Sequence, residues 1–565
     1  NAYDFAFGPL GELFTFDSDG ERDVSLPWYR PTRVFHTVTG SHAGWLSRSW
    51  KQPNDFVDMP PVLAEFGRGS PTGVACYQHS QFPGKYRGSL FVLDWTYGRV
   101  LNLKLKRDGA SFTAESESFM TGVGQHGFAP TDAIVGPDGS LYVSVGGRGT
   151  RGGVYRIRHA QRTASDWPGA TESSAEKAAA CVAAPEPLSS WSRAIWEPLA
   201  EAAGRDEFVR LATNRDLPVV ERLRAIEILT ERFGGIGATT VKNLQSDPVA
   251  DIRARAVWSI GRTFPAHKIA TAVTPFLADQ DAFVGRVACE ALLGLPGELD
   301  GNALTDALAR RLASKSKFDR VAAARIIPQL TQAAFAAVSV KSTEFGWTAA
   351  VNNALGYLGR QSGFNGYVFE IGMHVLERDL SPEVKLEAVR LMQLGLGDVG
   401  AIGKVPPVFD GYAATLDLKP HERELDPLII KLSELFPTGD KRLDEELGRL
   451  LAMLQPFNPG LLSKVLAKIT SESHPTDDLH YLIVAARIPA LRDQSHQAAI
   501  AKGLVELELK LRKRGLHQDS NWDDRLGELY KSLVDQDETL PDAIVKQSGF
   551  GLPGHVLYMS RLPAE

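Results

Sequence analysis

The chain has 565 residues, of which 43% are hydrophobic and 23% are charged, and these values are typical of a globular protein with two or more domains. The formal net charge of -6 gives no reason to expect nucleic acid or an anionic membrane as a partner, and no apolar run approaches the roughly 18 residues that span a bilayer. Isolated Cys76, Cys181 and Cys289 exclude a disulfide framework and a Cys-x-x-Cys-His haem attachment site within these residues.

Residues 1–160 contain short runs of β-branched and aromatic residues separated by Gly, Pro, Asp and Asn, a pattern that predicts many short antiparallel strands. The turn Gly8-Pro9-Leu10-Gly11 is echoed by Gly136-Pro137-Asp138-Gly139. The offset of about 128 residues equals roughly three units of about 43, which is the period of β-propeller blades. We therefore predict a partial β-propeller of about three to four blades over residues 1–160. The chain then begins inside a repeat array and is expected to be an internal fragment.

A run of carboxylates follows the first predicted hairpin. Asp17, Asp19, Glu21 and Asp23 stand at every second position, and such a loop offers the oxygen ligands that calcium prefers. The run is not an EF-hand, because Trp28 stands where the bidentate glutamate would be. The same alternation also fits a solvated strand face that Arg22 neutralises. A calcium site and a solvated face both remain open here.

The stretch "PWYRPTRVFH" is dense in residues that bind ligands. Aromatic rings can stack, arginines present planar donor forks, and a histidine can titrate near neutral pH. The candidates for lining a cleft on the top face are Trp28, Tyr29, Arg30, Arg33 and His36. The alternative is a structural connection between blades, in which the rings pack and the arginines bond to carbonyl groups.

Residues 161–190 are rich in Ala, Ser, Glu and Pro, show no strand period, and predict a linker between domains. Residues 191–400 then show a helical period in which a small residue recurs every 31 to 34 positions or so, as in HEAT or armadillo repeats. We expect this residue to lie where two helices approach most closely. The recurring residues are Ala225, Ala256, Ala288, Ala322, Ala354 and Ala388.

Arginines precede four of these alanines, and we expect them to bond to the neighbouring helix turn; they are Arg224, Arg255, Arg286 and Arg320. Residues 401–565 predict a further α-helical solenoid region with looser repetition. Within it, His474, Asp477, Asp478 and His480 stand close together. Ser471, Ser473 and the run Thr476-Asp477-Asp478 favour N-cap chemistry before a helix over a metal site.

Three stretches resemble the propellers of sugar and sorbosone dehydrogenases: "LFVLDWTYGRVLNLKL", "PTDAIVGPDGSLYVSVGGRGTRGGVYRI" and "GSHAGW". "PWYRPTRVFH" together with "FPGKYRGSLFVLDWTYGR" resembles the "membrane-bound dehydrogenase" proteins of planctomycetes and verrucomicrobia. In that group a propeller is followed by HEAT-type helices and then by a c-type cytochrome domain. The resemblance implies a periplasmic or otherwise extracytoplasmic protein, with haem c held beyond residue 565.

The same resemblance implies a cofactor position. Soluble quinoproteins of this fold hold pyrroloquinoline quinone and calcium, and Asn1 matches the asparagine of their cofactor-binding Arg-Asn pair. Thr96 or Tyr97 stands where those proteins have a lysine, and the arginines expected near Thr131 are absent. Because the quinone carries three carboxylates, the loss of these cations removes several charge-assisted hydrogen bonds. The sequence therefore does not favour pyrroloquinoline quinone.

Two functional hypotheses follow. In the first, the chain is part of a dehydrogenase that passes electrons from a sugar-like or alcohol substrate to a c-type haem domain outside this chain. In the second, it is a non-catalytic recognition scaffold that binds polysaccharide or protein partners, the latter through its helices. No catalytic residue is assigned, because the sequence shows no complete nucleophile–base pair, metal set or phosphate cradle. For the residues present, we expect scaffold behaviour.

Overall fold

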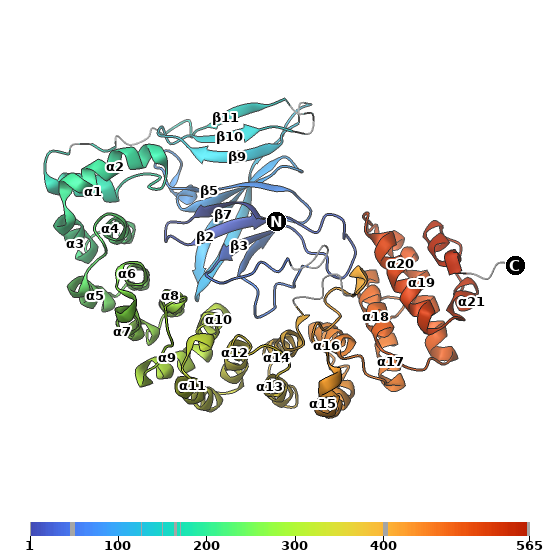
Figure 1. Ribbon diagram of the computed structural model, residues 1–565. Coiled ribbons are helices and arrows are strands. Elements are labelled where there is room, and N and C mark those ends of the chain that lie inside the picture. Colours follow the sequence, from blue (N-terminus) through green and yellow to red (C-terminus); the bar gives the residue numbers. More distant parts are fainter. Residues whose placement is uncertain are drawn as a thin grey trace. The chain divides into compact units, whose positions relative to one another are not determined.

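The computed structural model describes residues 2–45, 51–125, 127–147, 149, 151–162, 167–169, 171–398 and 405–561. These residues form two compact units. The first unit comprises Asn1–Asp19, Pro31–His42 and Pro60–Gly356, and the second comprises Gly20–Arg30, Ala43–Met59 and Tyr357–Glu565. The fold is mixed: the first unit contains three small antiparallel sheets and a series of helices, and the described elements of the second unit are helices (Figure 1).

Each sheet is built from strands that follow one another in the chain, as expected where short turns join antiparallel strands. The first sheet has the order β1-β2-β3-β4, the second β5-β6-β7-β8 and the third β11-β10-β9. Strand β5 contacts both β1 and β9, so the first strands of the three sheets are neighbours. The strands are β1 (Ala2–Phe7), β2 (Leu13–Asp17), β3 (Arg33–Thr37), β4 (Val62–Glu65), β5 (Pro71–Tyr77), β6 (Ser89–Asp94), β7 (Arg99–Asp108), β8 (Ser111–Thr121), β9 (Pro130–Val135), β10 (Leu141–Val145) and β11 (Gly153–Ile157).

The two echoed turns have the same structure and join the first two strands of the first and third sheets. The amide of Gly11 donates to the carbonyl of Gly8 at 2.8 Å, and the amide of Gly139 donates to that of Gly136 at 2.9 Å. Both second glycines have positive φ, +70° in Gly11 and +75° in Gly139. The echo therefore marks equivalent positions in two sheets.

The predicted unit of about 43 residues is wrong, because one sheet, not two, lies between the echoed turns. The sheets begin at Ala2, Pro71 and Pro130. The first interval is long because the connections after β2 and β3 carry segments that belong to the second compact unit. A repeat length calculated from only two copies of the turn does not account for such insertions.

Replacing Gly139 by alanine is expected to destabilise the first unit by about 1–3 kcal/mol. A Cβ atom there would stand 2.4 Å from Nδ1 of His79, in a backbone conformation that L-residues rarely adopt. Urea denaturation followed by circular dichroism measures the change. Gly84→Ala is the matched control, because nothing lies within 4 Å of its Cβ position. Equal stability of the two variants would contradict the prediction.

Helices α1 to α12 belong to the first unit, and the helices from α3 onward follow one another in chain order (Figure 1). Their bounds are α1 (Ser174–Val182), α2 (Ser190–Ala203), α3 (Arg205–Thr213), α4 (Val219–Arg232), α5 (Ala238–Gln245), α6 (Ala250–Thr263), α7 (Ala266–Leu277), α8 (Ala282–Leu292), α9 (Asn302–Leu312), α10 (Lys317–Ala324), α11 (Gln332–Phe345) and α12 (Trp347–Tyr357). Helix α1 lies within the predicted linker 161–190. Ser173 and Glu176 form a capping box at its start, and Cys181 is buried, so a stretch that reads as a linker by composition is a packed helix there.

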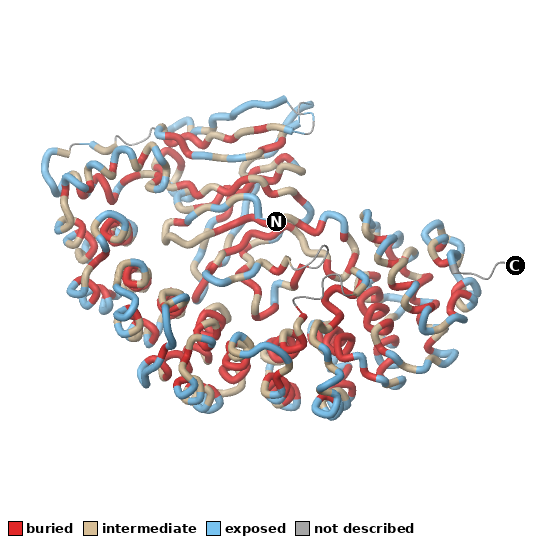
Figure 2. Tube along the Cα trace, viewed as in Figure 1, coloured by how far each residue is buried: buried red, intermediate tan, exposed pale blue. Residues whose placement is uncertain are grey.

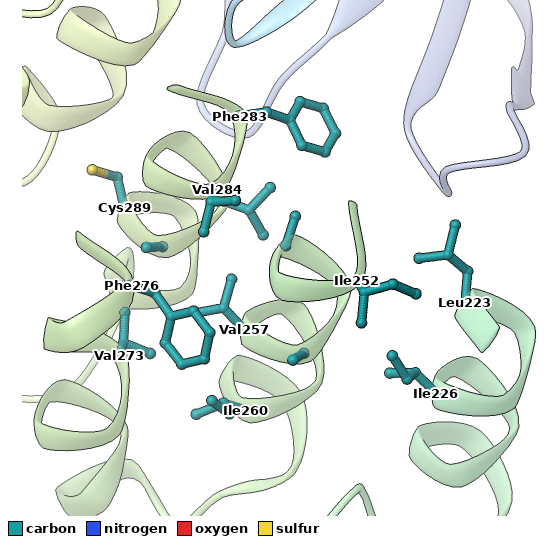
Figure 3. Close-up of a cluster of buried hydrophobic side chains, with 14 of the residues drawn as sticks. Leu223, Ile226, Ile252, Val257, Ile260, Val273, Phe276, Phe283, Val284 and Cys289 are labelled. Atoms are coloured by element: carbon teal, nitrogen blue, oxygen red, sulfur yellow. The ribbon is translucent and has the colours of Figure 1, made fainter. Parts of the chain in front are cut away.

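The recurring alanines are buried, as their spacing predicts. Each is at most 3% exposed, and those of the first unit lie on α4, α6, α8, α10 and α12. Alternate helices contact one another, α4 with α6 and α6 with α8. Figure 3 shows the apolar cluster between them, with Ile226 from α4, Val257 from α6 and Val284 from α8. A small residue at the closest approach lets these larger side chains interdigitate.

Two of the recurring arginines bond to a neighbouring helix turn, as expected, through Glu227 for Arg255 and Glu290 for Arg286, and they also reach sheet turns. Arg255 donates to the carbonyl of Leu10 in the turn between β1 and β2, and Arg286 donates to the carbonyl of Ala110 in the turn between β7 and β8, at 2.8 Å. Sheet turns reach these helices within the first unit, and a guanidinium satisfies their carbonyl groups. Arg320 donates locally, to the carbonyl of Ser314 at 2.8 Å.

The helices of the second unit surround a separate hydrophobic core, which also takes in Leu26 and Trp28. Figure 2 shows buried residues on one side of most helices and exposed residues on the other. Within the described part of the chain, no helix is both long and apolar enough to cross a membrane. The helices are α13 (Gly366–Leu376), α14 (Pro382–Gly395), α15 (Glu422–Leu435), α16 (Lys441–Leu454), α17 (Pro459–Leu466), α18 (Pro475–Arg487), α19 (Gln494–Arg514), α20 (Trp522–Gln536) and α21 (Leu540–Val545).

Candidate functional site

The residues suggested for cofactor and metal binding do not form one group. Asn1 lies outside the described residues. Asp17 and Asp19 are buried in the first unit, where Oδ2 of Asp19 is 3.8 Å from Nε of Arg68. Glu21 and Asp23 belong to the second unit. Among the described residues, no group of three or more His, Cys, Asp or Glu could hold a metal ion, and calcium binding stays a prediction.

The five cleft-lining candidates are divided between the units. Trp28, Tyr29 and Arg30 belong to the second unit, whereas Arg33 and His36 lie on β3 of the first. The Trp28 ring is fully buried in the core and offers no stacking face to a ligand. Arg33 is also fully buried, with its guanidinium 5.0 Å from the centre of the Phe35 ring.

His36 is part of a buried network with the outline of a catalytic triad. Its Nδ1 is 2.9 Å from Oγ of Ser111, and its Nε2 is 2.7 Å from Oε2 of Glu12, which also accepts from Arg286 at 2.7 Å. Burial lowers the pKa of His36, against the influence of Glu12. The cavity beside Glu12 holds about 30 Å³, room for water but not for a substrate. The network joins the first two sheets to helix α8.

Arg30 is the candidate that does line a cavity. In the second unit, a cavity of about 510 Å³ lies between residues 27–30, residues 53–55, Tyr412, and helices α16 and α18. Its charged lining consists of four cations and four carboxylates: Arg30, Lys441, Arg442, Arg449, Asp55, Glu445, Glu446 and Asp477. Asn54, Tyr412, Thr476 and His480 add uncharged polar groups to the lining.

The segment before Arg30 holds its side chain in place through successive turns. The amide of Leu26 donates to the carbonyl of Asp23 at 2.9 Å, and the amide of Tyr29 donates to that of Leu26 at 3.0 Å. Leu26 and Trp28 are buried in the core, and Pro27 between them lines the cavity. Nη1 of Arg30 then donates to the carbonyls of Pro27, at 3.0 Å, and Tyr29, at 2.8 Å.

Helices α16 and α18 supply the opposite wall. Glu446 and Arg449 are one turn apart on α16, with Oε1 of Glu446 3.0 Å from Nη2 of Arg449. A second oxygen of Glu446 accepts from Gln393 at 2.9 Å. Nδ1 of His480, on α18, is hydrogen-bonded to the Tyr412 hydroxyl at 2.7 Å. These side chains are nearly all buried and leave little freedom in their positions.

Burial is the largest influence on the pKa values of three side chains that line this cavity. It raises the pKa of Glu446, although Arg449 opposes the change, and it raises the pKa of Glu445, which Lys441 opposes and Asp477 reinforces. It lowers the pKa of His480 to about 3, and Arg449 acts in the same direction. The imidazole is therefore neutral near pH 7 and serves as a hydrogen-bonding group.

This lining offers many hydrogen-bonding groups to a ligand. It contains no cysteine or serine among the described residues, and the hydroxyl of Thr476 already donates to the carbonyl of Ser25 at 3.1 Å. Cations and carboxylates alternate with neutral donors and acceptors, a composition that suits a small ligand with many hydrogen-bonding groups.

Sequence reasoning did not find most of this lining. A helix begins near residue 474, as predicted, but its cap is His474, whose side chain accepts from the amide of Thr476 at α18's first turn. The same helix places His480 in the cavity, where its partner Tyr412 is distant in sequence. No local motif connects α16, α18 and Arg30, so no spacing in the sequence could reveal the site.

Comparisons with known proteins leave the family open. Residues 58–144 match the model of a domain of unknown function (DUF7133). No curated protein matches the chain. One solved structure that matches is a Thermus thermophilus protein assigned to the oxidoreductases (glucose dehydrogenase), at 24% identity and a TM-score of 0.22. The match covers 28% of this chain and 44% of that chain.

Proposed function

We propose that this chain is a recognition scaffold, built from part of a β-propeller and a HEAT-like array of helices, that binds a small carbohydrate-like ligand in the Arg30 cavity. The observation that carries the proposal is the lining of that cavity, in which four cations, four carboxylates and several neutral polar groups converge on about 510 Å³. That volume is within the range of small-molecule sites in proteins.

The ligand class follows from the charges. Because the formal charges of the lining cancel, a strongly charged ligand gains little from the cavity as a whole. A ligand rich in hydroxyl groups both donates and accepts, and planar guanidinium and carboxylate groups can each bond two neighbouring hydroxyls. Peptides and apolar molecules would leave many of these buried polar groups without partners, at a cost in affinity.

The architectural part of the proposal rests on the sheets and the alanines. The first strands β1, β5 and β9 are neighbours, as the inner strands of propeller blades are, and two of the three sheets share the same glycine turn. The buried alanines recur on alternate helices in the manner of stacked helix pairs.

Carbohydrate binding is tested by saturation-transfer NMR and calorimetry on the full chain with a panel of neutral and acidic monosaccharides and short oligosaccharides. We expect at least one sugar to bind. Asn54→Trp should abolish that binding, because exposed Asn54 lines the cavity and an indole would fill it. Glu538→Trp, at an exposed position outside the lining, is the control and should bind normally. A panel without any binder would contradict the proposal.

For the parent protein we propose kinship with extracytoplasmic dehydrogenases that pass electrons to a c-type haem domain. Its support is the sequence resemblance of residues 1–160, with "PTDAIVGPDGSLYVSVGG" and "LFVLDWTYGR" as the matching stretches. In such a protein the present chain would contribute substrate recognition and support. Reduction of an attached haem on addition of the bound sugar, followed by visible absorbance, is the corresponding measurement.

A further inference from the structure

The cations of the Arg30 cavity differ in how they are paired. Arg449 is paired with Glu446 at 3.0 Å, Lys441 with Asp477 at 2.6 Å, and Arg442 with Glu383 at 3.2 Å. For Arg30, no ion pair is found within the described ranges of the chain. Arg30 thus brings a positive charge to the cavity that no carboxylate contacts directly.

The geometry of Arg30 leaves one edge of its guanidinium available. Nη1 is occupied by the carbonyls of Pro27 and Tyr29. The remaining Nε and Nη2 groups form the side edge of the fork, which matches the two oxygens of a carboxylate in a bidentate pair. Because the two carbonyl bonds fix the plane of the guanidinium, this edge is oriented before a ligand arrives.

The electrostatic surroundings of Arg30 favour an anion. Burial lowers the pKa of Arg30 and the neighbouring Arg449 lowers it further, whereas Glu446, Tyr412 and Asp55 act in the other direction. Because no carboxylate of the described residues forms an ion pair with Arg30, a carboxylate on the ligand would supply its direct partner.

From these observations we infer that the ligand is an acidic sugar of the uronic acid class, whose carboxylate is bound side-on by Arg30. This inference rests on the proposed carbohydrate-binding function and adds the carboxylate group and the residue that selects it. The hydroxyl groups of the sugar would contact the remainder of the lining, where Glu446, Tyr412 and His480 lie.

The test compares glucuronate and galacturonate with glucose and galactose by calorimetry on the full chain, with acetate as an anion-only probe. We expect the uronates to bind at least tenfold more tightly than the neutral sugars, and acetate to bind weakly. Arg30→Gln should remove the preference for the uronates over the neutral sugars. Arg30→Lys should keep part of it, because the charge remains and the fork is lost.

Arg423→Gln is the matched control, since Arg423 is exposed in the same unit and lies outside the lining, and the preference should persist in this variant. Thermal unfolding of each variant shows whether the turn at Pro27 is intact. Equal binding of uronates and neutral sugars by the wild type would overturn the inference and leave the proposed function standing. A preference that survives in folded Arg30→Gln would also overturn it. Binding of no sugar at all would overturn both.

Discussion

Arg286→Leu is expected to destabilise the first unit by about 3–5 kcal/mol at pH 7. Arg286 is 1% exposed; it donates to Oε2 of Glu12 and to the carbonyl of Ala110, and its Nη1 is 2.6 Å from Oε1 of Glu290. The leucine would leave two carboxylates and a carbonyl without their donor in a buried place. Urea denaturation of the wild type and the variant measures the loss.

The effect of Arg286→Leu should depend on pH. Burial alone would raise the pKa of Glu12, but Arg286 and His36 outweigh it and lower that pKa to about 2. A lowered folded-state pKa means that Glu12 stabilises the protein above its unfolded pKa of 4.5 and that this contribution is lost as the pH falls toward 2. The difference between wild type and variant should therefore shrink in acid.

Arg310→Leu is the control for this experiment, because Arg310 is exposed on α9 and should change stability by no more than about 0.5 kcal/mol. A loss below about 1 kcal/mol in Arg286→Leu, or a loss that grows in acid, would show that the buried network does not hold sheet and helices together.

Glu186→Gln is expected to stabilise the first unit by up to about 3 kcal/mol at pH 7 and to have little effect at pH 4. Glu186 is 6% exposed, and its carboxylate accepts a hydrogen bond from the amide of Gln78 at 2.5 Å. Burial raises its pKa to about 8, although the Gln78 amide acts in the other direction. Glutamine keeps the shape and the acceptor but carries no charge to desolvate.

The sign of this pH dependence is opposite to that of Glu12. Because the folded-state pKa of Glu186 lies above the unfolded value of 4.5, its favourable contribution is complete below pH 4.5 and is lost as the pH rises to about 8. Between pH 4 and pH 8, the free energy of unfolding of the wild type, measured by urea denaturation, should decrease relative to that of Glu186→Gln. Glu172→Gln, at an exposed position, should follow the wild type at every pH. If the unfolding free energies of Glu186→Gln and the wild type changed equally with pH, the raised pKa of Glu186 would be refuted.

Local patterns allowed several predictions that the structure confirms. The glycine echo located two equivalent turns, because positive φ at a fixed place in a short turn requires glycine there. The alanine spacing located buried positions on the helices, because the helical period puts one residue of each repeat on the packed face. Each turn and each helix face is set by residues close together in the sequence, so both patterns can be recognised in one sequence without homologues.

Composition misled where the structure depends on distant partners. The Ala- and Glu-rich stretch before Pro187 reads as a linker, yet its capped helix is buried against other helices. The recurring arginines make the predicted contacts with neighbouring helix turns, but Arg255 and Arg286 also bond to sheet turns that lie far away in sequence. A guanidinium has five donors, and nothing in its own repeat shows which carbonyl will meet them.

By itself, the sequence determined the strand-rich start, the helical remainder and the positions of the alanines, because period and turn chemistry act over a few residues. Only the tertiary structure decided that Arg30 and Arg449 would line one cavity while His36 would enter a buried network. Such groups are brought together by the packing of whole segments, and the free energy of that packing is distributed over many apolar contacts that no single motif records.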